Sequence, residues 1–283
     1  MKRDRLTITL DSQVLKRVDS FIDGKKIRNR SHAIEYLVKS NLPLTVRQAV
    51  ILAGGPGVNF RPLTYEIPNV LIPFKGKPLL THLINQIKQA GINEIVICVG
   101  HLSEKIVKQF KDGQDFGVSL NYSFDGPRPL GTAGAILKAK KYLKNGPFLV
   151  IHGDVMSNID LQAMIDFHNG DKYLATLALT TIQDPRRHGI VRAKGIDLME
   201  FDEKPSKPRQ DSNLINAGIY ILEEVAFKYF PKKRPAMMEK DVFPKLVKAK
   251  KAAAYLFEGS WFDISYPEHY EQALKKFERK GVN

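Results

Sequence analysis

Apolar and polar residues recur along this chain with two periods, one typical of strands and one of helices. Strict alternation over residues 5–10 predicts a strand, and apolar positions three to four residues apart over 12–22 and 32–41 predict two short helices. Asp11 or Ser12 is expected to cap the first helix. One strand and two short helices bury too little apolar surface to fold alone, so we expect this segment to pair with a second copy.

From residue 48 onward, short apolar runs of strand length alternate with helical periodicity. The expected strands cover 49–52, 95–99, 118–122 and 148–155, and the expected helices include 79–90, 103–110 and one that opens near 131. This order indicates an α/β fold with a Rossmann-like mixed, mainly parallel sheet. We therefore expect two domains, residues 1–44 and 48–283, joined by a short linker.

Composition narrows the class of protein. Of 283 residues, 43% are hydrophobic and 26% are charged, as in ordinary soluble proteins, and no apolar run reaches the ~20 residues of a membrane span. We expect no membrane partner. The single cysteine, Cys98, lies in an apolar run and fits a buried strand and a reducing, cytoplasmic setting. The net charge of +14 fits a polyanionic partner such as nucleic acid, or a generally basic proteome.

A glycine cluster ends the first apolar run of the larger domain. Gly54, Gly55 and Gly57 follow Leu52 and Ala53 directly. Glycines at the end of a strand let backbone N–H groups approach a phosphate, and ligands of open α/β sheets bind at this edge. The alternative is a glycine-rich turn without a ligand. The spacing matches neither the dinucleotide fingerprint nor a P-loop.

Residues 52–64 read LAGGPGVNFRPLT, which resembles the signature of the sugar-1-phosphate nucleotidyltransferases (NDP-sugar pyrophosphorylases). That signature is Leu-Ala-Gly-Gly-x-Gly-Thr-Arg-Leu-x-Pro-Leu-Thr, followed by Pro-Lys-Pro. Later segments match the family in the same order: GTAG from 131, HGIV from 188, EKP from 203, NAGIY from 216 and WFDI from 261. The resemblance spans roughly residues 48–275.

The resemblance implies a set of ligand contacts. It places nucleotide contacts at Leu52, Ala53, Gly54, Gly55, Gly57, Gly131 and Thr132, sugar and sugar-phosphate contacts at Gly189, Glu203, Lys204 and Asn216, and Mg²⁺ ligands at Asp154 and Asp263. Hard cations of this kind take one or two carboxylates together with phosphate oxygens. For a single aspartate after a strand the alternative is a cap, and for a Glu-Lys pair it is a solvated surface.

The chain departs from the family at informative positions. Asn59 and Asn69 stand where the family has an Arg and a Lys that act on the phosphates. No catalytic residue is therefore assigned, although Arg61 is a candidate substitute. Removing one stabiliser of developing charge costs about 10²–10³ in rate, so two losses predict a drop on the order of 10⁴ or more. His188 replaces an aromatic residue, and Ser265 replaces a glycine.

The N-terminal segment, about residues 4–42, resembles ribbon-helix-helix DNA-binding proteins. The resemblance implies that paired strands enter the major groove of double-stranded DNA and read bases through Arg5, Thr7 and Thr9. It also implies phosphate contacts from Arg28, Arg30 and the helix start at Ser31. The implied assembly is a homodimer through the ribbon, or a higher oligomer. The alternative is a dimerisation arm that binds no DNA.

These observations together favour a DNA-binding transcriptional regulator. Its C-terminal domain, catalytically impaired, would bind a nucleotide or NDP-sugar effector, with Mg²⁺ accompanying the bound nucleotide. The alternative is an active sugar-1-phosphate nucleotidyltransferase that carries a DNA-binding or dimerising appendage. The sequence leaves open which base and which sugar are bound.

Overall fold

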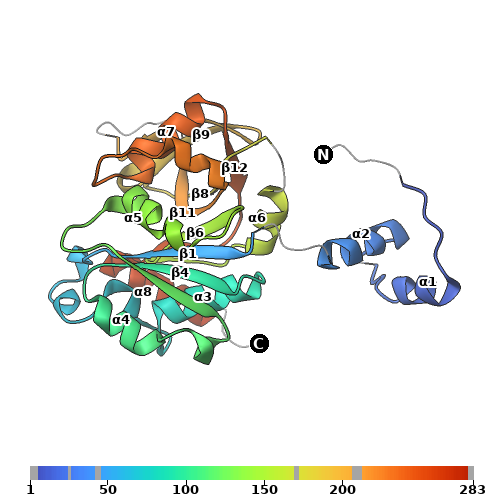
Figure 1. Ribbon diagram of the computed structural model, residues 1–283, viewed down its shortest axis with the longest axis horizontal. Coiled ribbons are helices and arrows are strands. Elements are labelled where there is room, and N and C mark those ends of the chain that lie inside the picture. The colour runs from blue at the N-terminus through green and yellow to red at the C-terminus, as the bar shows by residue number, and fades with distance from the viewer. Residues whose placement is uncertain (1–5, 25–26, 42–45, 169–171, 206–211, 280–283) are drawn as a thin grey trace. The chain divides into compact units, whose positions relative to one another are not determined.

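The computed structural model divides into two compact units, Met1–Leu44 and Thr45–Asn283. The structure describes residues 6–24, 27–41, 46–168, 172–205 and 212–279 (Figure 1). Arg5 and residues 42–45, which lie between the second expected helix and the larger expected domain, are therefore outside the described residues. In the described part of the chain, no helix is long and apolar enough to cross a membrane.

The helices and strands follow in chain order. The helices are α1 (Ser12–Asp19), α2 (Arg30–Asn41), α3 (Leu79–Gln89), α4 (Ser103–Phe110), α5 (Gly131–Ala139), α6 (Leu161–His168), α7 (Phe243–Lys248) and α8 (Pro267–Arg279). The strands are β1 (Gln48–Ala53), β2 (Pro73–Phe74), β3 (Lys77–Pro78), β4 (Glu94–Val99), β5 (Ser119–Phe124), β6 (Phe148–His152), β7 (Val155–Ser157), β8 (Ala175–Thr181), β9 (Gly189–Lys194), β10 (Asp197–Glu203), β11 (Leu214–Leu222), β12 (Ala252–Leu256) and β13 (Trp261–Asp263).

One large sheet organises the second unit. Its strands run in the order β5-β4-β1-β6-β11-β8-β12-β10-β9. Strand β1 is parallel to both β4 and β6, while β11 is antiparallel to β6 and β8. This confirms the expected α/β fold with a mixed sheet. The expectation that the sheet is mainly parallel is wrong, because β11 is also antiparallel to β9, and β10 is antiparallel to β9 and β12. Because β1 and β6 are parallel neighbours, the segments that follow them leave the sheet at the same edge.

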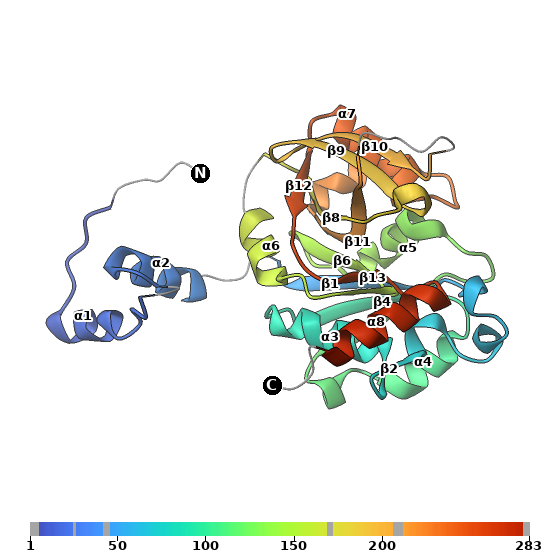
Figure 2. The same cartoon turned by 180° about the vertical axis from the view of Figure 1, so that it is seen from behind.

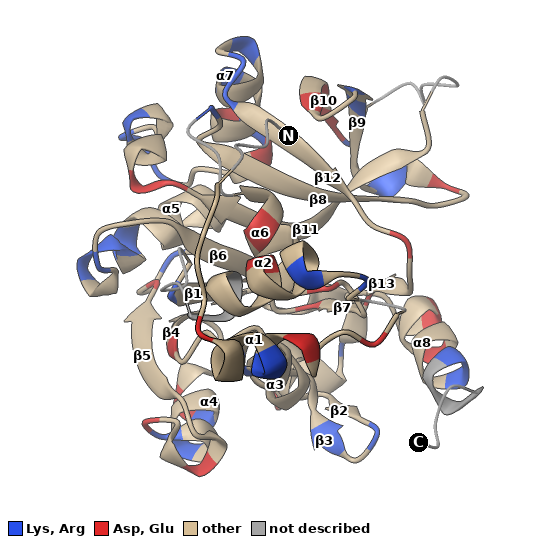
Figure 3. Cartoon of the chain, turned by 90° about the vertical axis from the view of Figure 1, so that its right-hand side faces the viewer, with Lys and Arg blue, Asp and Glu red and all other residues tan. Residues whose placement is uncertain are grey.

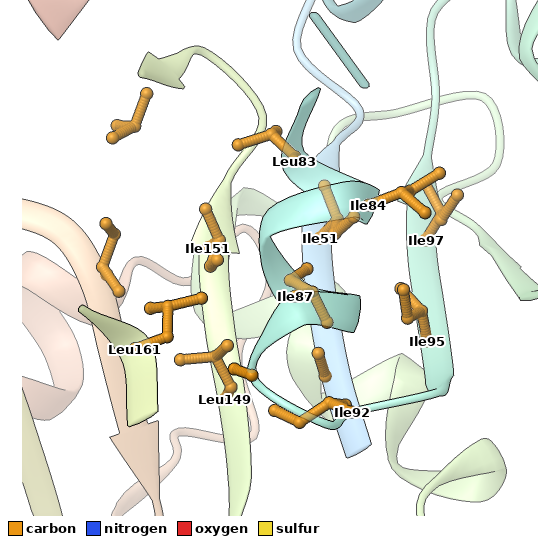
Figure 4. Close-up of a cluster of buried hydrophobic side chains, with 14 of the residues drawn as sticks. Ile51, Leu83, Ile84, Ile87, Ile92, Ile95, Ile97, Leu149, Ile151 and Leu161 are labelled. Carbon is orange, nitrogen blue, oxygen red and sulfur yellow. The ribbon is translucent and has the colours of Figure 1, made fainter. Parts of the chain in front are cut away.

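Both faces of the sheet are buried. Ile51 of β1 and Ile151 of β6 pack with Leu83 and Ile87 of α3 on one face (Figure 4). The alternate residues, including Val50, pack on the opposite face, where α5 and α7 supply apolar side chains. Figures 1 and 2 show α3 and α4 on one side of the sheet and α5 and α7 on the other. Burial on both faces explains why the strands read as continuous apolar runs.

The first unit differs from the sequence prediction at its start. Helix α1 begins as expected, with the Asp11 carboxylate accepting a hydrogen bond of 2.7 Å from the Gln13 N–H, but it ends at Asp19 rather than at 22. Residues 6–10 form no strand, and Thr7 and Thr9 are exposed. A lone strand has no partner for its ladder hydrogen bonds, so the alternation of residues does not form a ribbon within this chain. The structure therefore gives no support for a ribbon-helix-helix module.

One of the expected phosphate-binding arginines, Arg30, pairs with a carboxylate of the same unit. The Arg30 guanidinium donates hydrogen bonds of 2.7 and 2.9 Å to the Asp19 carboxylate, and this pairing lowers the pKa of Asp19. The backbone N–H of Arg28 lies 3.5 Å from the His32 ring, and Asn29 caps α2 by accepting a hydrogen bond from the His32 N–H. Arg30 thus links α1 to α2.

Candidate active site

Three adjoining cavities lie where β1 and β6 leave the sheet. The first cavity is lined by Leu52, Gly54, Gly55, Cys98, Asp125, Pro129, Gly131, Thr132, Ala135, His152, Asp154 and Met237. The second is lined by Leu52, Ala53, Gly55, Pro56, Gly57, Val58, Asn59, Asn69, Val70, Gly153, Asp154 and Ser265. The third is lined by Thr132, His152, Asp154, Val155, Arg187, His188, Gly189, Glu203, Lys204, Asn216, Gly218, Met237, Glu239, Trp261, Asp263 and Ser265. Asp154 lines all three.

Two aspartates from distant parts of the sequence meet at this junction. Asp154 directly precedes β7, and β13 pairs with β7 so that Asp263 faces Val155 across the ladder. The backbone N–H of Ile264 donates a 2.7 Å hydrogen bond to the Asp154 carbonyl. At Gly153, an added Cβ would lie 2.6 Å from Val70 and 2.8 Å from the Leu52 carbonyl, so only glycine fits before Asp154.

The two carboxyl groups have opposite pKa shifts. Burial, and then the neighbouring charge of Asp263, raise the pKa of Asp154. Burial also acts to raise the pKa of Asp263, but His188 and hydrogen bonds from the hydroxyl and N–H of Ser265 outweigh it and lower that pKa. The Nε2 atom of His188 lies 3.3 Å from Asp263 Oδ2 without the alignment of a hydrogen bond. Ser265, where the related family has glycine, therefore helps to keep Asp263 ionised.

This aspartate pair fits a hard cation. Two neighbouring buried carboxylates repel each other, and a divalent ion between them removes both the repulsion and the cost of burying unpaired charge. Mg²⁺ takes one or two carboxylates and completes its shell with water and phosphate oxygens. Among the described residues, no group of three or more His, Cys, Asp or Glu side chains could hold a metal by itself, so a metal here needs oxygens from a substrate.

The second cavity is electrically neutral apart from Asp154. The Asn59 amide donates a 3.1 Å hydrogen bond to the Ser265 carbonyl, and Asn69 Oδ1 is buried without a hydrogen-bond partner. Among the described residues that line this cavity, none is Lys or Arg. Arg61 lines none of the three cavities; its guanidinium lies over the ring of Tyr65, 5.0 Å from the ring centre.

The third cavity carries the positive charge that the second lacks. Lys204 and Arg187 both line it, and Lys204 Nζ lies 3.8 Å from Glu203 Oε1. Burial, and then the nearby Glu239, raise the pKa of Glu203. An added Cβ at Gly189 would lie 2.7 Å from the Phe201 ring and 2.8 Å from Glu203 Oε2, so glycine there lets the Glu203 carboxylate reach the cavity wall.

Sequence reasoning missed several residues of the site. The Glu239 carboxylate accepts a 2.9 Å hydrogen bond from Thr132 and lies 3.7 Å from His152 Nε2. Thr132 in turn accepts a 2.8 Å hydrogen bond from the Met238 N–H. Arg187 lies just before the HGIV segment, and Asp125 follows β5. Only the neighbouring motif could have pointed to Arg187; nothing near Glu239 or Asp125 in the sequence marks them.

The predicted ligand residues gather in one place. All of the predicted nucleotide, sugar and metal contacts line one or more of the three cavities. In Figure 3, Lys and Arg are interspersed with Asp and Glu on α4 and α8.

Comparisons with known proteins are consistent with this geometry. Mannose-1-phosphate guanylyltransferase of Mycobacterium tuberculosis is 35% identical over 225 residues, 78% of this chain and 62% of the relative. Mannose-1-phosphate guanyltransferase of Kluyveromyces lactis is 34% identical over 227 residues, 79% of this chain and 62% of the relative. The chain thus spans less than two thirds of the length of these relatives. The crystal structure of HddC from Yersinia pseudotuberculosis complexed with GMP-PN superposes with a TM-score of 0.69 at 26% identity, covering 82% of this chain and all of that one.

These relatives correct the expected function. They are named as enzymes and match most of the chain, which contradicts a DNA-binding transcriptional regulator and favours the alternative, a sugar nucleotidyltransferase. Residues 48–280, which contain all three cavities, match the nucleotidyl transferase family. The chain therefore belongs to the nucleotidyl transferase family.

Proposed function

We propose that this protein is an active sugar-1-phosphate nucleotidyltransferase. A phosphate oxygen of the sugar 1-phosphate attacks the α-phosphorus of a nucleoside triphosphate. The bond from the α-phosphorus to the bridging oxygen breaks, and pyrophosphate leaves with the electron pair. The observation that carries the proposal is the Asp154–Asp263 pair at the junction of three cavities, which suits two phosphorylated substrates that meet at one metal-binding centre.

Each of the three cavities has a lining that suits a different part of the two substrates. The first, with apolar and glycine walls, takes the nucleoside. The second, where the glycine loop follows β1, takes the departing phosphates. The third takes the sugar phosphate: Lys204 and Arg187 face the phosphate, while Glu203 and Asn216 accept hydrogen bonds from sugar hydroxyls.

Asp154 and Asp263 would hold Mg²⁺ together with phosphate oxygens of the bound nucleotide. A cation held there would supply positive charge to offset the negative charge of those oxygens. Ser265 keeps Asp263 ionised and aimed at the site through its two hydrogen bonds. The described residues of the second cavity offer backbone N–H groups and the amides of Asn59 and Asn69 but no cation, so we expect transfer to be slower than in a site with cations there.

The names of the relatives suggest the first substrates to test. Those at 34–35% identity are called mannose-1-phosphate guanylyltransferase or guanyltransferase, so GTP and mannose 1-phosphate are the proposed pair.

A pyrophosphate-release assay with Mg²⁺ tests the proposal. Each of GTP, ATP, UTP, CTP and dTTP is offered with mannose 1-phosphate and with glucose 1-phosphate. We expect multiple turnovers for at least one pair. Asp154→Asn should lose at least about 10²-fold in kcat, because it removes half of the carboxylate pair. Asp115→Asn, an exposed change outside all three cavities, should behave as wild type. No turnover with any pair, or full activity in Asp154→Asn, would refute the assignment.

The N-terminal unit serves assembly in this proposal. Leu6, Ile8, Val14 and Phe21 are 82%, 45%, 45% and 41% exposed, a high apolar exposure for so small a unit. Pairing of two copies through residues 6–10 covers these side chains. Light scattering should give a dimer for the full chain and a monomer for Leu6→Lys/Ile8→Lys. A wild-type monomer at micromolar concentration would exclude this assembly.

The domain boundary follows from the two compact units. The chain from residue 46 onward contains all three cavities and every strand of the large sheet, so it should fold and turn over substrate without residues 1–45. Loss of activity in that shortened chain, with its melting temperature unchanged, would mean that the N-terminal unit contributes to the site.

A further inference from the structure

A second buried glutamate lines the third cavity and has no task in the function proposed above. Glu239 lies in a π-helical turn, Met238–Val242, and is 6% exposed. It lines the third cavity and not the first. Burial, and then the charge of Glu239, raise the pKa of Glu203, so the two carboxylates are close neighbours. The cavity proposed for the sugar phosphate therefore contains two carboxylates rather than one.

The two oxygens of the Glu239 carboxylate have different surroundings. Oε2 accepts the 2.9 Å hydrogen bond from the Thr132 hydroxyl, and that hydroxyl accepts a 2.8 Å hydrogen bond from the Met238 N–H. Oε1 receives no hydrogen bond from any described residue. The Nε2 atom of His152, 3.7 Å from Oε1, is itself buried without a hydrogen-bond partner. Glu239 thus has one oxygen held in place and one oxygen available to a ligand.

Backbone contacts fix the segments that carry this pair. The Ala236 carbonyl accepts hydrogen bonds of 2.9 and 3.1 Å from two N–H groups in the first turn of α5. At Gly131, an added Cβ would lie 2.4 Å from the Ala236 oxygen, so only glycine permits this close approach. Thr132 and Glu239 therefore lie on two segments whose separation is set by the backbone, and their hydrogen bond forms before any substrate binds.

The free oxygen of Glu239 needs a hydrogen-bond donor. A buried carboxylate oxygen without one is costly, and phosphates cannot supply it, because they are anions themselves. Among the described residues no group of three or more His, Cys, Asp or Glu side chains could hold a metal, so Glu239 does not complete a metal site with Asp154 and Asp263. Sugar hydroxyls are the donors that remain in this cavity. We propose that Glu239 Oε1 accepts a hydrogen bond from one sugar hydroxyl, and that Thr132 is the positioning residue that holds the carboxylate in this orientation.

This assignment rests on the proposed function, since it uses the third cavity as the site of the sugar phosphate. It goes further by naming a residue that selects among sugars. It also gives Thr132, which the family resemblance places at the nucleotide, a task on the sugar side. The competing role is structural: the hydrogen bond would only tie α5 to the Met238–Val242 turn. A structural tie affects all sugars equally, whereas a hydroxyl acceptor affects only sugars that carry that hydroxyl.

Steady-state kinetics of the full-length protein with Mg²⁺ and GTP provide the test. The sugar substrates are mannose 1-phosphate and its monodeoxy derivatives at C2, C3, C4 and C6. Glu239→Gln keeps the shape of the side chain and removes its charge, so it should lower kcat/KM for mannose 1-phosphate about 10- to 100-fold, mainly through the KM of the sugar phosphate. For the one derivative that lacks the partner hydroxyl, the variant and wild type should agree within about twofold. If the pyrophosphate-release assay identifies another substrate pair, that pair and its deoxy sugars are used instead.

The role of Thr132 is tested with the same sugars. Thr132→Val removes the hydroxyl and should raise the KM of mannose 1-phosphate about 10-fold, and the double variant with Glu239→Gln should raise it no further than Glu239→Gln alone. Thr132→Ser keeps a hydroxyl and should recover most of this loss. Glu104→Gln, an exposed change on α4 outside all three cavities, is the matched control and should behave as wild type. Melting temperatures establish which variants fold, and Thr132→Val with the deoxy sugars carries the test if Glu239→Gln does not fold.

The outcomes distinguish this assignment from the function on which it rests. A wild-type protein that turns over no pair of nucleotide and sugar 1-phosphate would overturn both. An active protein in which Glu239→Gln loses the same factor with every sugar, or loses nothing, would overturn the role of Glu239 alone. Independent losses that multiply in the double variant would overturn the role of Thr132 as the positioning residue.

Discussion

A positive charge placed in the second cavity should accelerate nucleotidyl transfer. The position to change is Asn69, whose side-chain oxygen is buried without a hydrogen-bond partner and which lines the cavity together with Asp154. Asn69→Lys puts an ammonium group beside the departing phosphates. Because phosphoryl-type transfers depend mainly on positioning and on neutralising charge, the added cation should act on the chemical step.

The magnitude follows from the burial of the site. Two unit charges about 4 Å apart interact by about 4 kcal/mol at an effective dielectric constant near 20, and by about 1 kcal/mol in water. Only the part of this interaction energy that develops in the transition state raises kcat. For comparable groups that part is ~3 kcal/mol, or about 10²–10³ in rate. Asn59 is exposed, so the water value applies there. Asn59→Arg should gain only about fivefold.

Steady-state pyrophosphate release measures the effect as kcat and as kcat/KM for the triphosphate. Asn69→Met supplies a long side chain without charge, and Asn121→Lys adds the same charge at an exposed position on β5, outside all three cavities. We expect Asn69→Lys to exceed both controls by about 10²-fold, with the gain mainly in kcat.

Two results would refute this reasoning. If Asn69→Lys were no faster than Asn69→Met, charge in the second cavity would not limit the reaction. If Asn121→Lys gave the same gain, a general electrostatic effect would replace the local one. Melting temperatures of all three variants exclude a loss of folding as the cause.

Three further predictions concern other parts of the larger unit. Asp263→Asn should lower kcat by at least about 10²-fold and raise the Mg²⁺ concentration for half-maximal activity, and a metal titration that matches wild type would remove Asp263 from the metal site. Burial lowers the pKa of His168 to about 4, against about 6.5 in an unfolded chain. Between these two pH values the unfolded state binds one more proton than the folded state. The contribution of neutral His168 to the free energy of unfolding is therefore fully present above about pH 6.5 and decreases by up to about 3 kcal/mol as the pH falls to about 4. An ion pair between protonated His168 and Glu223, 3.3 Å away, would reduce this loss. Urea unfolding of His168→Asn should show a weaker loss over this range than wild type, and an identical loss would contradict the assignment. Gly189→Ala should raise KM for the sugar phosphate about tenfold with KM for the nucleotide unchanged, because the new methyl group displaces Glu203; equal changes in both would indicate general misfolding.

The larger unit was predictable where local pattern and tertiary packing agree. The expected helix over 103–110 matches α4, and the expected strand over 95–99 lies within β4 (Glu94–Val99), because their apolar residues face a core on the sheet. The motif residues gather at one edge of the sheet because β1 and β6 are parallel neighbours. The apolar pattern predicted these elements correctly because their apolar side chains are buried against other parts of the same chain.

The remaining features depend on contacts that no local pattern records. The alternation over 5–10 predicted a strand, but a strand needs a partner, and the described residues 6–10 have none within this chain. Glu239 enters the site because a segment far along the chain hydrogen-bonds to Thr132. Arg30 was expected to bind phosphate, yet Asp19, 11 residues earlier, takes its guanidinium. In each case the deciding partner is distant in sequence or lies outside the chain.

The pairing of β7 with β13 has a consequence for how catalytic competence arises. The two carboxylates of the proposed metal centre come from positions 154 and 263, so a nascent chain that has already formed β1, β4 and β6 still lacks one of them. The ability to hold a cation therefore appears only after the last strand has docked. A protein shortened before residue 261 would keep most of its sheet and its glycine loop, and would still be unable to assemble the pair of carboxylates on which the proposed turnover depends.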